Sequence, residues 1–236
     1  MKKLGSLICC EIRKIVKSSV FKVLTIAFAV LPPISLIKYS SAANVNFEWY
    51  LADVLNTFSA ILVIGFAFTT CWVFGREYTD KTINDLLVKP VSKLKIATSK
   101  FIAISLWNTL LTIIMFAVVV LLGAYTGLVG GTAALILHYL AMFMAVALLT
   151  MFVSTVSAFM ANAFKGYLAP IGLIFLIVVI INVVENIGLS AYIPWTIPDL
   201  LLSDGFLSPI SVLILVVTGI AGFAGTVAWW RFKEQQ

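Results

Sequence analysis

The side chains that could do chemistry are few, and most of them lie between residues 75 and 100. Catalysis inside a membrane would need a nucleophile or a set of metal ligands, but His138 is the only histidine. No Gly-x-Ser motif lies in an apolar stretch, and a His-Glu-x-x-His motif is absent. A phosphatidyltransferase needs several neighbouring aspartates, and only Asp80 and Asp85 are close together. The sequence therefore disfavours an intramembrane enzyme, and we expect no catalytic residue, metal or directly bound cofactor.

The stretch from residue 75 to 100 reads as a short helix followed by a longer one. Thr82, with Asp85 three residues later, fits a capping box. Pro90 would end the short helix and Ser92 would cap the next. The apolar side of the short helix would carry Ile83, Leu86 and Leu87. Its charged flanks are Glu77, Asp80, Lys81 and Lys89. We expect the apolar side chains to face outward as a docking peg for a soluble partner, and the alternative is an ordinary charged turn.

The elements around this stretch are those of a membrane protein. Of the 236 residues, 62% are hydrophobic and 11% are charged, against about 25% charged in soluble domains. A segment of about 20 apolar residues crosses a bilayer. Six such segments are predicted, at about 20–37, 51–74, 101–122, 134–160, 167–187 and 209–230. Their long apolar runs do not alternate with polar residues, which favours an all-α membrane protein over a β-barrel.

The basic residues predict the orientation of these spans. All of the 16 lysines and arginines except Lys38 lie before or at the start of the first span, after the sixth, or in the loops after the second and fourth. The positive-inside rule then places both termini in the cytoplasm. The net charge of +6 reports this topology rather than nucleic-acid binding. No A-x-A site follows the first apolar run, so we expect that run to stay as an anchor rather than to be cleaved.

Residues 1–19 form an amphipathic segment. Apolar residues recur at helical spacing between lysines, so the segment can lie in the membrane interface with its lysines toward anionic headgroups. One interpretation is a simple surface anchor. The other is an elbow helix that also contacts a cytoplasmic partner. Residues 231–236 would form a short cytoplasmic tail.

The longest outer loop, residues 188–208, is rich in proline and aromatic side chains. This composition predicts either a partly re-entrant cap or an interfacial anchor. The candidate residues for an outer cap or a substrate exit are Tyr192, Pro194, Trp195, Pro198, Asp199 and Glu185. Boundary charges are the alternative interpretation of Glu185 and Asp53.

Three other features of the spans are candidates for packing or proton chemistry. His138 could take part in a proton relay, although no carboxylate is near it in sequence. Asn162 could hydrogen-bond between helices. The small residues Gly219, Gly222 and Gly225 predict close helix approach, either within the chain or in a dimer.

The loop between the second and third spans resembles the signature of type-2 ABC transporter permeases. The residues that carry the resemblance are Glu77, Thr82, Leu86, Leu87, Pro90, Val91, Ser92, Lys93, Lys100 and Phe101. The family pattern usually has glycine at position 81 and arginine at position 93, where this chain has lysine. Six spans, cytoplasmic termini and an amphipathic elbow extend the resemblance over the whole chain.

The resemblance implies the membrane subunit of an ATP-driven exporter in the bacterial cytoplasmic membrane. Residues 77–89 would form a coupling helix against a separate ABC ATPase, and the N-terminal helix would complete that contact. ATP and magnesium would bind to the ATPase, since this sequence has no Gly-x-x-x-x-Gly-Lys-Ser/Thr loop. Two permease chains, identical or different, would work among membrane lipids with two ATPase copies.

The cargo is the least defined part of the resemblance. The Pro-Trp-x-x-Pro segment at residues 194–198 is similar to small permeases that export bacteriocins, lantibiotics, bacitracin or amphipathic peptide toxins. We therefore expect a peptide-like substrate. The alternatives are a drug or lipid exporter, and an ion-coupled secondary transporter, although the two halves of the chain show no convincing repeat.

Overall fold

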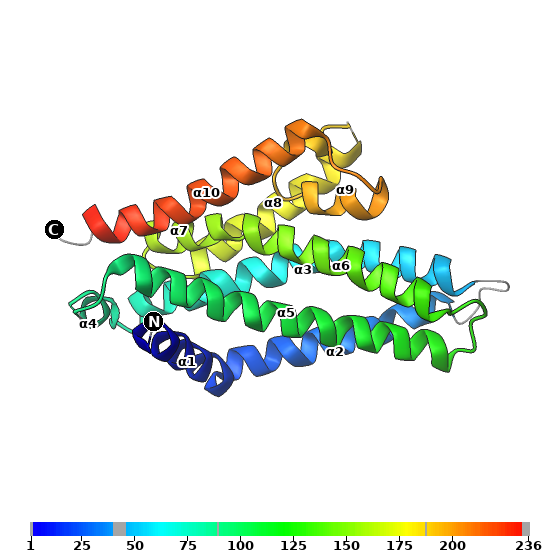
Figure 1. Cartoon of the computed structure of the whole chain (residues 1–236). Coiled ribbons are helices and arrows are strands. Elements are labelled where there is room, and N and C mark those ends of the chain that lie inside the picture. The colour runs from blue at the N-terminus through cyan, green and yellow to red at the C-terminus, as the bar shows by residue number, and fades with distance from the viewer. Residues whose placement is uncertain (1, 40–45, 89, 187, 233–236) are drawn as a thin grey trace.

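The computed structural model describes residues 2–39, 46–88, 90–186 and 188–232, and within these ranges the regular structure is helical apart from one isolated bridge between Asn46 and Val129. The elements are α1 (Lys2–Lys17), α2 (Ser19–Tyr39), α3 (Phe47–Thr79), α4 (Ile83–Leu87), α5 (Lys93–Tyr125), α6 (Ala133–Val153), α7 (Thr155–Ala163), α8 (Leu168–Asn186), η1 (Ser190–Tyr192), α9 (Ile197–Ser203) and α10 (Pro209–Phe232). Figure 1 shows α1, α4 and the last turn of α10 at one end of the bundle, here called the α4 end. The opposite end, toward which α9 lies, is the α9 end.

The predicted all-α membrane architecture is confirmed at the level of its helices. Among the described residues, α3, α5, α6 with α7, and α10 are long and apolar enough to cross a membrane. A fifth candidate arises if α1 and α2, which meet at a bend of 70°, form one broken span. The described apolar stretch of α8 is shorter, Leu168–Ile181. The structure therefore supports four or five crossings, and the count of six stays a prediction.

Side-chain caps explain where three of the long helices begin. Asn46 accepts a hydrogen bond from the backbone N–H of Trp49 at 2.8 Å, before α3. Thr132 caps α6 in the same way. Ser92 accepts from the N–H of Lys95 at 3.4 Å before α5, which confirms the predicted cap. Helices α3 and α5 each have 33 residues, so at about 1.5 Å per residue they extend beyond a hydrocarbon core of about 30 Å.

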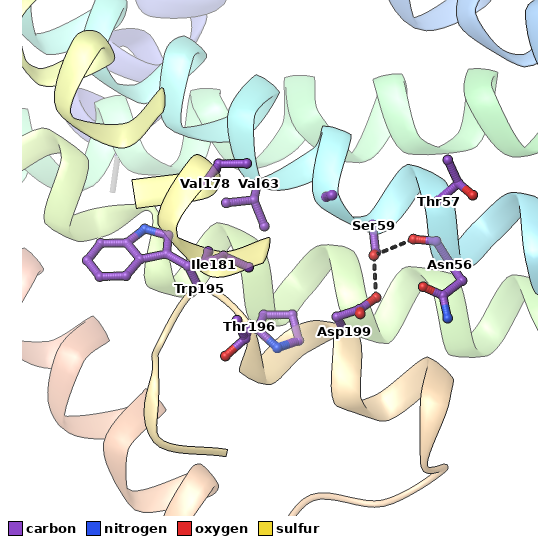
Figure 2. Close-up of a pocket in the computed structure, with 11 residues that line it drawn as sticks. Asn56, Thr57, Ser59, Val63, Val178, Ile181, Trp195, Thr196 and Asp199 are labelled. Carbon is purple, nitrogen blue, oxygen red and sulfur yellow. Dashed lines mark hydrogen bonds between the residues drawn. The ribbon is translucent and has the colours of Figure 1, made fainter. Parts of the chain in front are cut away.

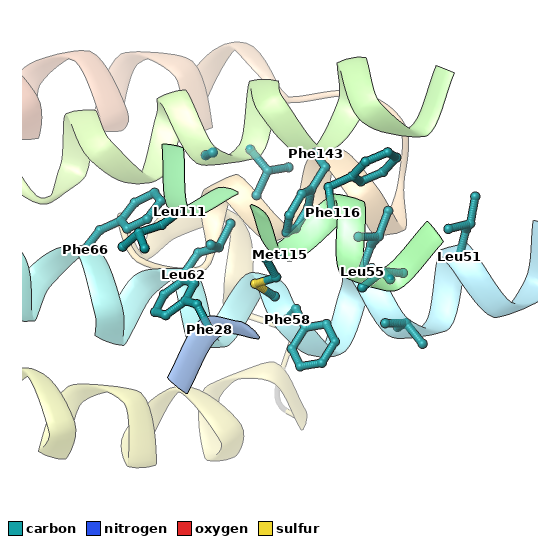
Figure 3. Close-up of a cluster of buried hydrophobic side chains, with 14 of the residues drawn as sticks. Phe28, Leu51, Leu55, Phe58, Leu62, Phe66, Leu111, Met115, Phe116 and Phe143 are labelled. Carbon is teal, nitrogen blue, oxygen red and sulfur yellow. The ribbon is translucent and has the colours of Figure 1, made fainter. Parts of the chain in front are cut away.

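Helix α3 is the centre of the bundle and contacts α5, α6, α7, α8 and α9. Its apolar stretch is 72% buried, against 39% or less for the other three long spans. Figure 3 shows Leu62 and Phe66 of α3 against Leu111 of α5, and Phe143 of α6 beside Phe116. Because α3 is the most buried of the long helices and contacts most of the others, their positions depend on it.

The proline pair of α2 does not interrupt the helix. The sequence predicts a break at Pro32 and Pro33, near the outer end of the first span, but α2 continues through both to Tyr39. Each proline removes one backbone hydrogen bond, and helices in membranes tolerate this loss when the freed carbonyls find other partners.

The glycines of α10 pack against other helices of the same chain. Of the two interpretations given above, close approach within the chain is therefore confirmed. A Cβ on Gly222 would lie 2.5 Å from the backbone nitrogen of Val156, and one on Gly219 would clash with the ring of Phe152. The hydroxyl of Thr155, just after the break between α6 and α7, donates to the carbonyl of Gly219 at 2.8 Å. Backbone therefore meets backbone where α10 crosses α7.

A valine at Gly222 should destabilise the protein by at least about 2 kcal/mol, because the clash is with backbone rather than with a movable side chain. Gly172→Val is the matched control, since nothing lies within 4 Å of a Cβ at that helical glycine in α8. Thermal unfolding of the purified variants in detergent measures the difference. Equal melting temperatures for the two variants would show that the close approach of α10 does not limit stability.

Candidate functional site

Helix α3 ends in a tight hydrogen-bonded turn, and this turn determines where α4 begins. The N–H of Thr82 donates to the carbonyl of Glu77 at 2.9 Å, and the N–H of Lys81 donates to that of Tyr78 at 3.0 Å. Lys81 has a φ of 57°, in the left-handed region that favours glycine. Together these features make a Schellman motif. They also explain why the resembled family usually has glycine at this position.

Helix α4 follows directly, and it is oriented differently from the prediction. Ile83 and Leu86 are each 7% exposed and pack into the bundle, so the apolar side does not face outward. The predicted capping box is also wrong, because the Thr82 side chain caps no N–H of α4. Instead its hydroxyl donates to a carboxylate oxygen of Glu77 at 2.6 Å. A carboxylate acceptor makes the stronger hydrogen bond, and the left-handed turn brings it within reach.

Glu77 belongs to a cluster of four charged residues, here called the charge cluster, in which Glu11, Glu77 and Lys100 are buried and Lys14 is partly exposed. The ammonium of Lys100 lies 2.7 Å from a Glu77 oxygen and 2.9 Å from a Glu11 oxygen. Lys14 lies 3.1 Å from each of the same two carboxylates. Two positive and two negative charges therefore alternate in space, and they join α1, the end of α3 and the start of α5.

Because the charge cluster is largely buried, it restricts how α1, α3 and α5 can be arranged. Lys100 is fully buried and Glu77 is 3% exposed, which corrects the expectation that Glu77 flanks an exposed peg. Each ion has two oppositely charged neighbours, and Lys100 also points at the carbonyl of Val73. Buried charges are tolerated only when they are paired and hydrogen-bonded in this way. The cluster therefore holds α1 against the α3–α5 pair in one arrangement.

Acidification tests this arrangement. Burial by itself raises the pKa of Glu11, but the ammonium groups of Lys100 and Lys14 outweigh it and lower the pKa below its ordinary value of 4.5. The contribution of Glu11 to stability is therefore complete above pH 4.5 and is lost as the pH falls through the lower pKa of the folded state. We expect wild-type thermal stability in detergent to fall below pH 4.5, while Glu11→Gln starts less stable at neutral pH and changes less. Parallel pH profiles of the two proteins would contradict this assignment.

A second polar cluster lies on the other side of the end of α3. The hydroxyl of Tyr78 donates to Asn162 of α7 at 3.0 Å, and the indole N–H of Trp230 in α10 donates to the same amide oxygen at 2.7 Å. Lys93 donates to the carbonyl of Trp230 at 2.8 Å. The prediction that Asn162 hydrogen-bonds between helices is confirmed. Neighbouring residues of α3 thus link it to α1 and α5 on one side and to α7 and α10 on the other.

Part of the accessible surface at this end comes from the outward side of α4 and from the residues beside it. Val88 is 83% exposed, which is high for a large apolar side chain, and Asn84 and Asp85 are exposed next to it. Asp80 and Lys81 are exposed as well, and Leu87 is half-buried. Lys89 lies outside the described residues. These side chains, one apolar and several polar or charged, are the part of α4 and its flanks that a partner could reach.

The predicted outer cap is ordered and folds onto the bundle. Helix α9 packs against α6 and α3, and Ile197 and Pro198 are buried. Asp199 accepts a hydrogen bond from Ser59 of α3, and Ser59 also donates to the carbonyl of Asn56 (Figure 2). A cavity of about 200 Å³ lies between the cap, α3 and α8.

The other predicted residues of this region differ in their placement. Trp195 and Pro198 line the cavity with Asp199, Pro194 is half-buried, and Tyr192 is exposed. The side chain of Glu185 lies outside the described residues. His138 is exposed on α6 with its ring edge-on to Tyr139, at 5.6 Å between ring centroids.

Sequence reasoning missed the partners of the predicted residues. Glu11 and Lys14 looked like ordinary polar positions of an amphipathic helix, and Ser59 like a small residue in an apolar span. For Lys100, the sequence did contain a feature that could have indicated a buried ion pair. A lysine at the start of an apolar helix, next to Phe101, needs a counter-ion unless it reaches water.

Comparisons with known proteins agree with this architecture. The family model described as ABC-2 family transporter protein matches residues 7–182, which is most of the chain and includes α4 and the charge cluster. A relative from Bacillus licheniformis, the bacitracin transport permease protein BCRB, is 26% identical over 178 residues, covering 72% of this chain and 86% of the relative. With its helical bundle, its apolar spans and this match, the chain belongs to the ABC-2 family of transporter proteins and is a multi-pass membrane permease of the type-2 ABC class.

Proposed function

We propose that this chain is the membrane subunit of an ATP-driven exporter and crosses the bacterial cytoplasmic membrane six times with both termini in the cytoplasm. ATP hydrolysis takes place on a separate ABC ATPase. Two permease chains and two ATPase copies form the working complex. This proposal extends the family membership, since the ABC-2 match implies an ATPase partner and a second permease chain without naming either.

The observation that carries the proposal is the way α4 packs against the bundle. The helix lies between the ends of the two longest spans, and its buried Ile83 and Leu86 pack into the bundle. Through Thr82 and Glu77 it is connected to the charge cluster. A force applied to the exposed side of α4 therefore reaches α3, α5 and α1 together rather than bending a loose loop.

This arrangement suits a lever between two states. When ATP closes the ATPase pair, the two α4 helices are carried with it, and the bundle moves between inward and outward access. Packed elements respond to such a displacement by switching between discrete arrangements rather than by deforming continuously. The role of the charge cluster is to keep α1, α3 and α5 moving as one body.

We propose an amphipathic peptide as the cargo and the outer cap as part of its exit. The similarity to a bacitracin permease supports this cargo class. A second candidate is a lipid or an apolar drug. It is favoured by a groove of about 370 Å³ between α5, α6, α7 and α10, lined mainly by apolar side chains such as Phe101, Phe152 and Phe223.

Copurification tests the proposal. The tagged chain is extracted from its native membrane in mild detergent, and the proteins that accompany it are identified by mass spectrometry. We expect an ABC ATPase in equal amount, with a sister permease only if the dimer is mixed. A chain that is reproducibly free of any ATPase, yet transports in vesicles, would overturn the exporter in favour of an ion-coupled transporter.

A further inference from the structure

The cavity beneath the outer cap has a polar end and an apolar end. Asn56, Thr57, Ser59 and Asp199 lie together at one side of Figure 2, and Trp195 lies with Val63 and Ile181 at the other. The volume of about 200 Å³ is below the range of about 300–1,000 Å³ that drug-sized ligands occupy. The cavity therefore fits one side chain or end group rather than a whole drug-sized molecule.

Among the described residues, no positively charged side chain pairs with the carboxylate of Asp199 in this cavity. Asp199 receives one hydrogen bond, from the neutral hydroxyl of Ser59 to its Oδ1 atom. Among the described residues that line the cavity there is no lysine, arginine or histidine. Burial raises the pKa of Asp199, and the negative charge of Asp204 acts in the same direction. A half-buried carboxylate in such surroundings is stabilised by any cation that enters.

Aromatic and electrostatic features favour the same kind of ligand. Trp195 lies at the apolar end of the cavity. An indole ring attracts ammonium and guanidinium groups through its π face. The exposed acidic residue Glu48, at the start of α3, adds negative charge at the α9 end. Negative charge at this end of the molecule raises the local concentration of cations.

We infer that this cavity binds one organic cationic group, an ammonium or guanidinium with an attached apolar segment, and that Asp199 is its counter-ion. Ser59 and Asn56 position the carboxylate, and Trp195 covers the apolar segment. The inference deepens the proposed export function, on which its meaning for cargo rests, by naming a basic and apolar end of the peptide as the group that the outer cap holds. The binding itself can be measured without an ATPase.

Isothermal titration calorimetry on the purified full chain in detergent micelles tests the inference, with empty micelles subtracted. The probes are phenethylammonium and 2-phenylethanol, which have the same apolar segment and differ in charge. We expect the ammonium to bind the wild-type protein at least about tenfold more tightly than the alcohol. Asp199→Asn should remove this preference while keeping an acceptor for Ser59. Asp204→Asn removes a charge that acts on Asp199 from outside the cavity lining, so it should weaken the preference much less than Asp199→Asn does.

Three results would overturn the inference. Equal affinities of the two probes for the wild-type chain would remove the charge recognition, whether or not the variants fold. An unchanged preference in Asp199→Asn would place the cation elsewhere, and an equal loss in Asp204→Asn would reduce the effect to the general field of the cap. In nanodiscs, phenethylammonium binding that phosphatidylethanolamine blocks and phosphatidylglycerol does not would assign the site to a lipid headgroup instead of cargo.

The outcomes also separate this inference from the exporter itself. A chain that recruits and stimulates an ATPase but shows no preference for the ammonium keeps the proposed function and loses only the cation site. A chain that prefers the ammonium but never associates with an ATPase keeps the site and loses the exporter.

Discussion

Lys100→Met is expected to lower the stability of the purified protein by about 3–5 kcal/mol, which is a large part of the stability of a typical domain. Methionine nearly matches the length and shape of the lysine side chain, so the loss comes from charge rather than from volume. The variant leaves the carboxylates of Glu11 and Glu77 buried with Lys14 as their one ammonium neighbour in the charge cluster. Thermal unfolding in detergent, read as the loss of the monodisperse peak on size-exclusion chromatography, measures the effect.

Two further variants test whether the loss of stability comes from the unbalanced charge rather than from replacing a lysine. Lys14→Met removes an ammonium whose side chain is 32% exposed, so water can compensate its partners and a smaller loss of about 1 kcal/mol is expected. The double variant Lys100→Met with Glu77→Gln removes one charge of each sign and leaves the pair of Glu11 and Lys14. It should be more stable than the single Lys100 variant. The cluster would lose its assigned role if both single variants melted alike, or if the double variant were the least stable of the set.

Val88→Arg is expected to reduce association with the ATPase that copurifies with the wild-type chain by at least about tenfold, with little change in melting temperature. The side chain is 83% exposed, so the bundle loses no packing when it is replaced. Arginine at this position would place an unpaired charge inside the contact, and a loss of about 1.4 kcal/mol in binding free energy is already tenfold in affinity. Quantitative copurification and ATP hydrolysis by the isolated complex measure the effect.

Val129→Arg is the matched control for this prediction. That valine is 81% exposed in the loop between α5 and α6, at the opposite end of the bundle. The same change there should leave ATPase association intact. If both variants bind the ATPase like wild type, α4 is not the contact surface, and if both lose it, the effect is one of charge in general.

The sequence by itself determined where the long helices of this protein lie. The six apolar segments predicted at the start correspond to α2, α3, α5, α6 with α7, α8 and α10, and the amphipathic segment to α1. Hydropathy and capping are local properties, so a run of apolar residues and a serine at position 92 are enough to place a helix and its first turn. The family signature in the loop of residues 75–100 was readable for the same reason.

Only the tertiary structure decided which way α4 turns and what lies beneath it. Periodicity puts Ile83 and Leu86 on one side of α4, but it does not say whether that side meets the bundle or a partner. Thr82 shows the limit of local rules. A capping residue was predicted from its neighbour three positions later, while its hydroxyl binds the carboxylate of Glu77, which the left-handed turn at Lys81 brings close.

The two sites themselves depend on residues that are far apart in sequence. Glu11 and Lys100 are separated by 89 positions, and Ser59 and Asp199 by 140. No periodicity, cap or motif relates such pairs, because their contact depends on how whole helices pack against α3. The sequence determined which segments become helices, while the packing around one buried helix decided which charges neutralise each other and which carboxylate is left for a ligand.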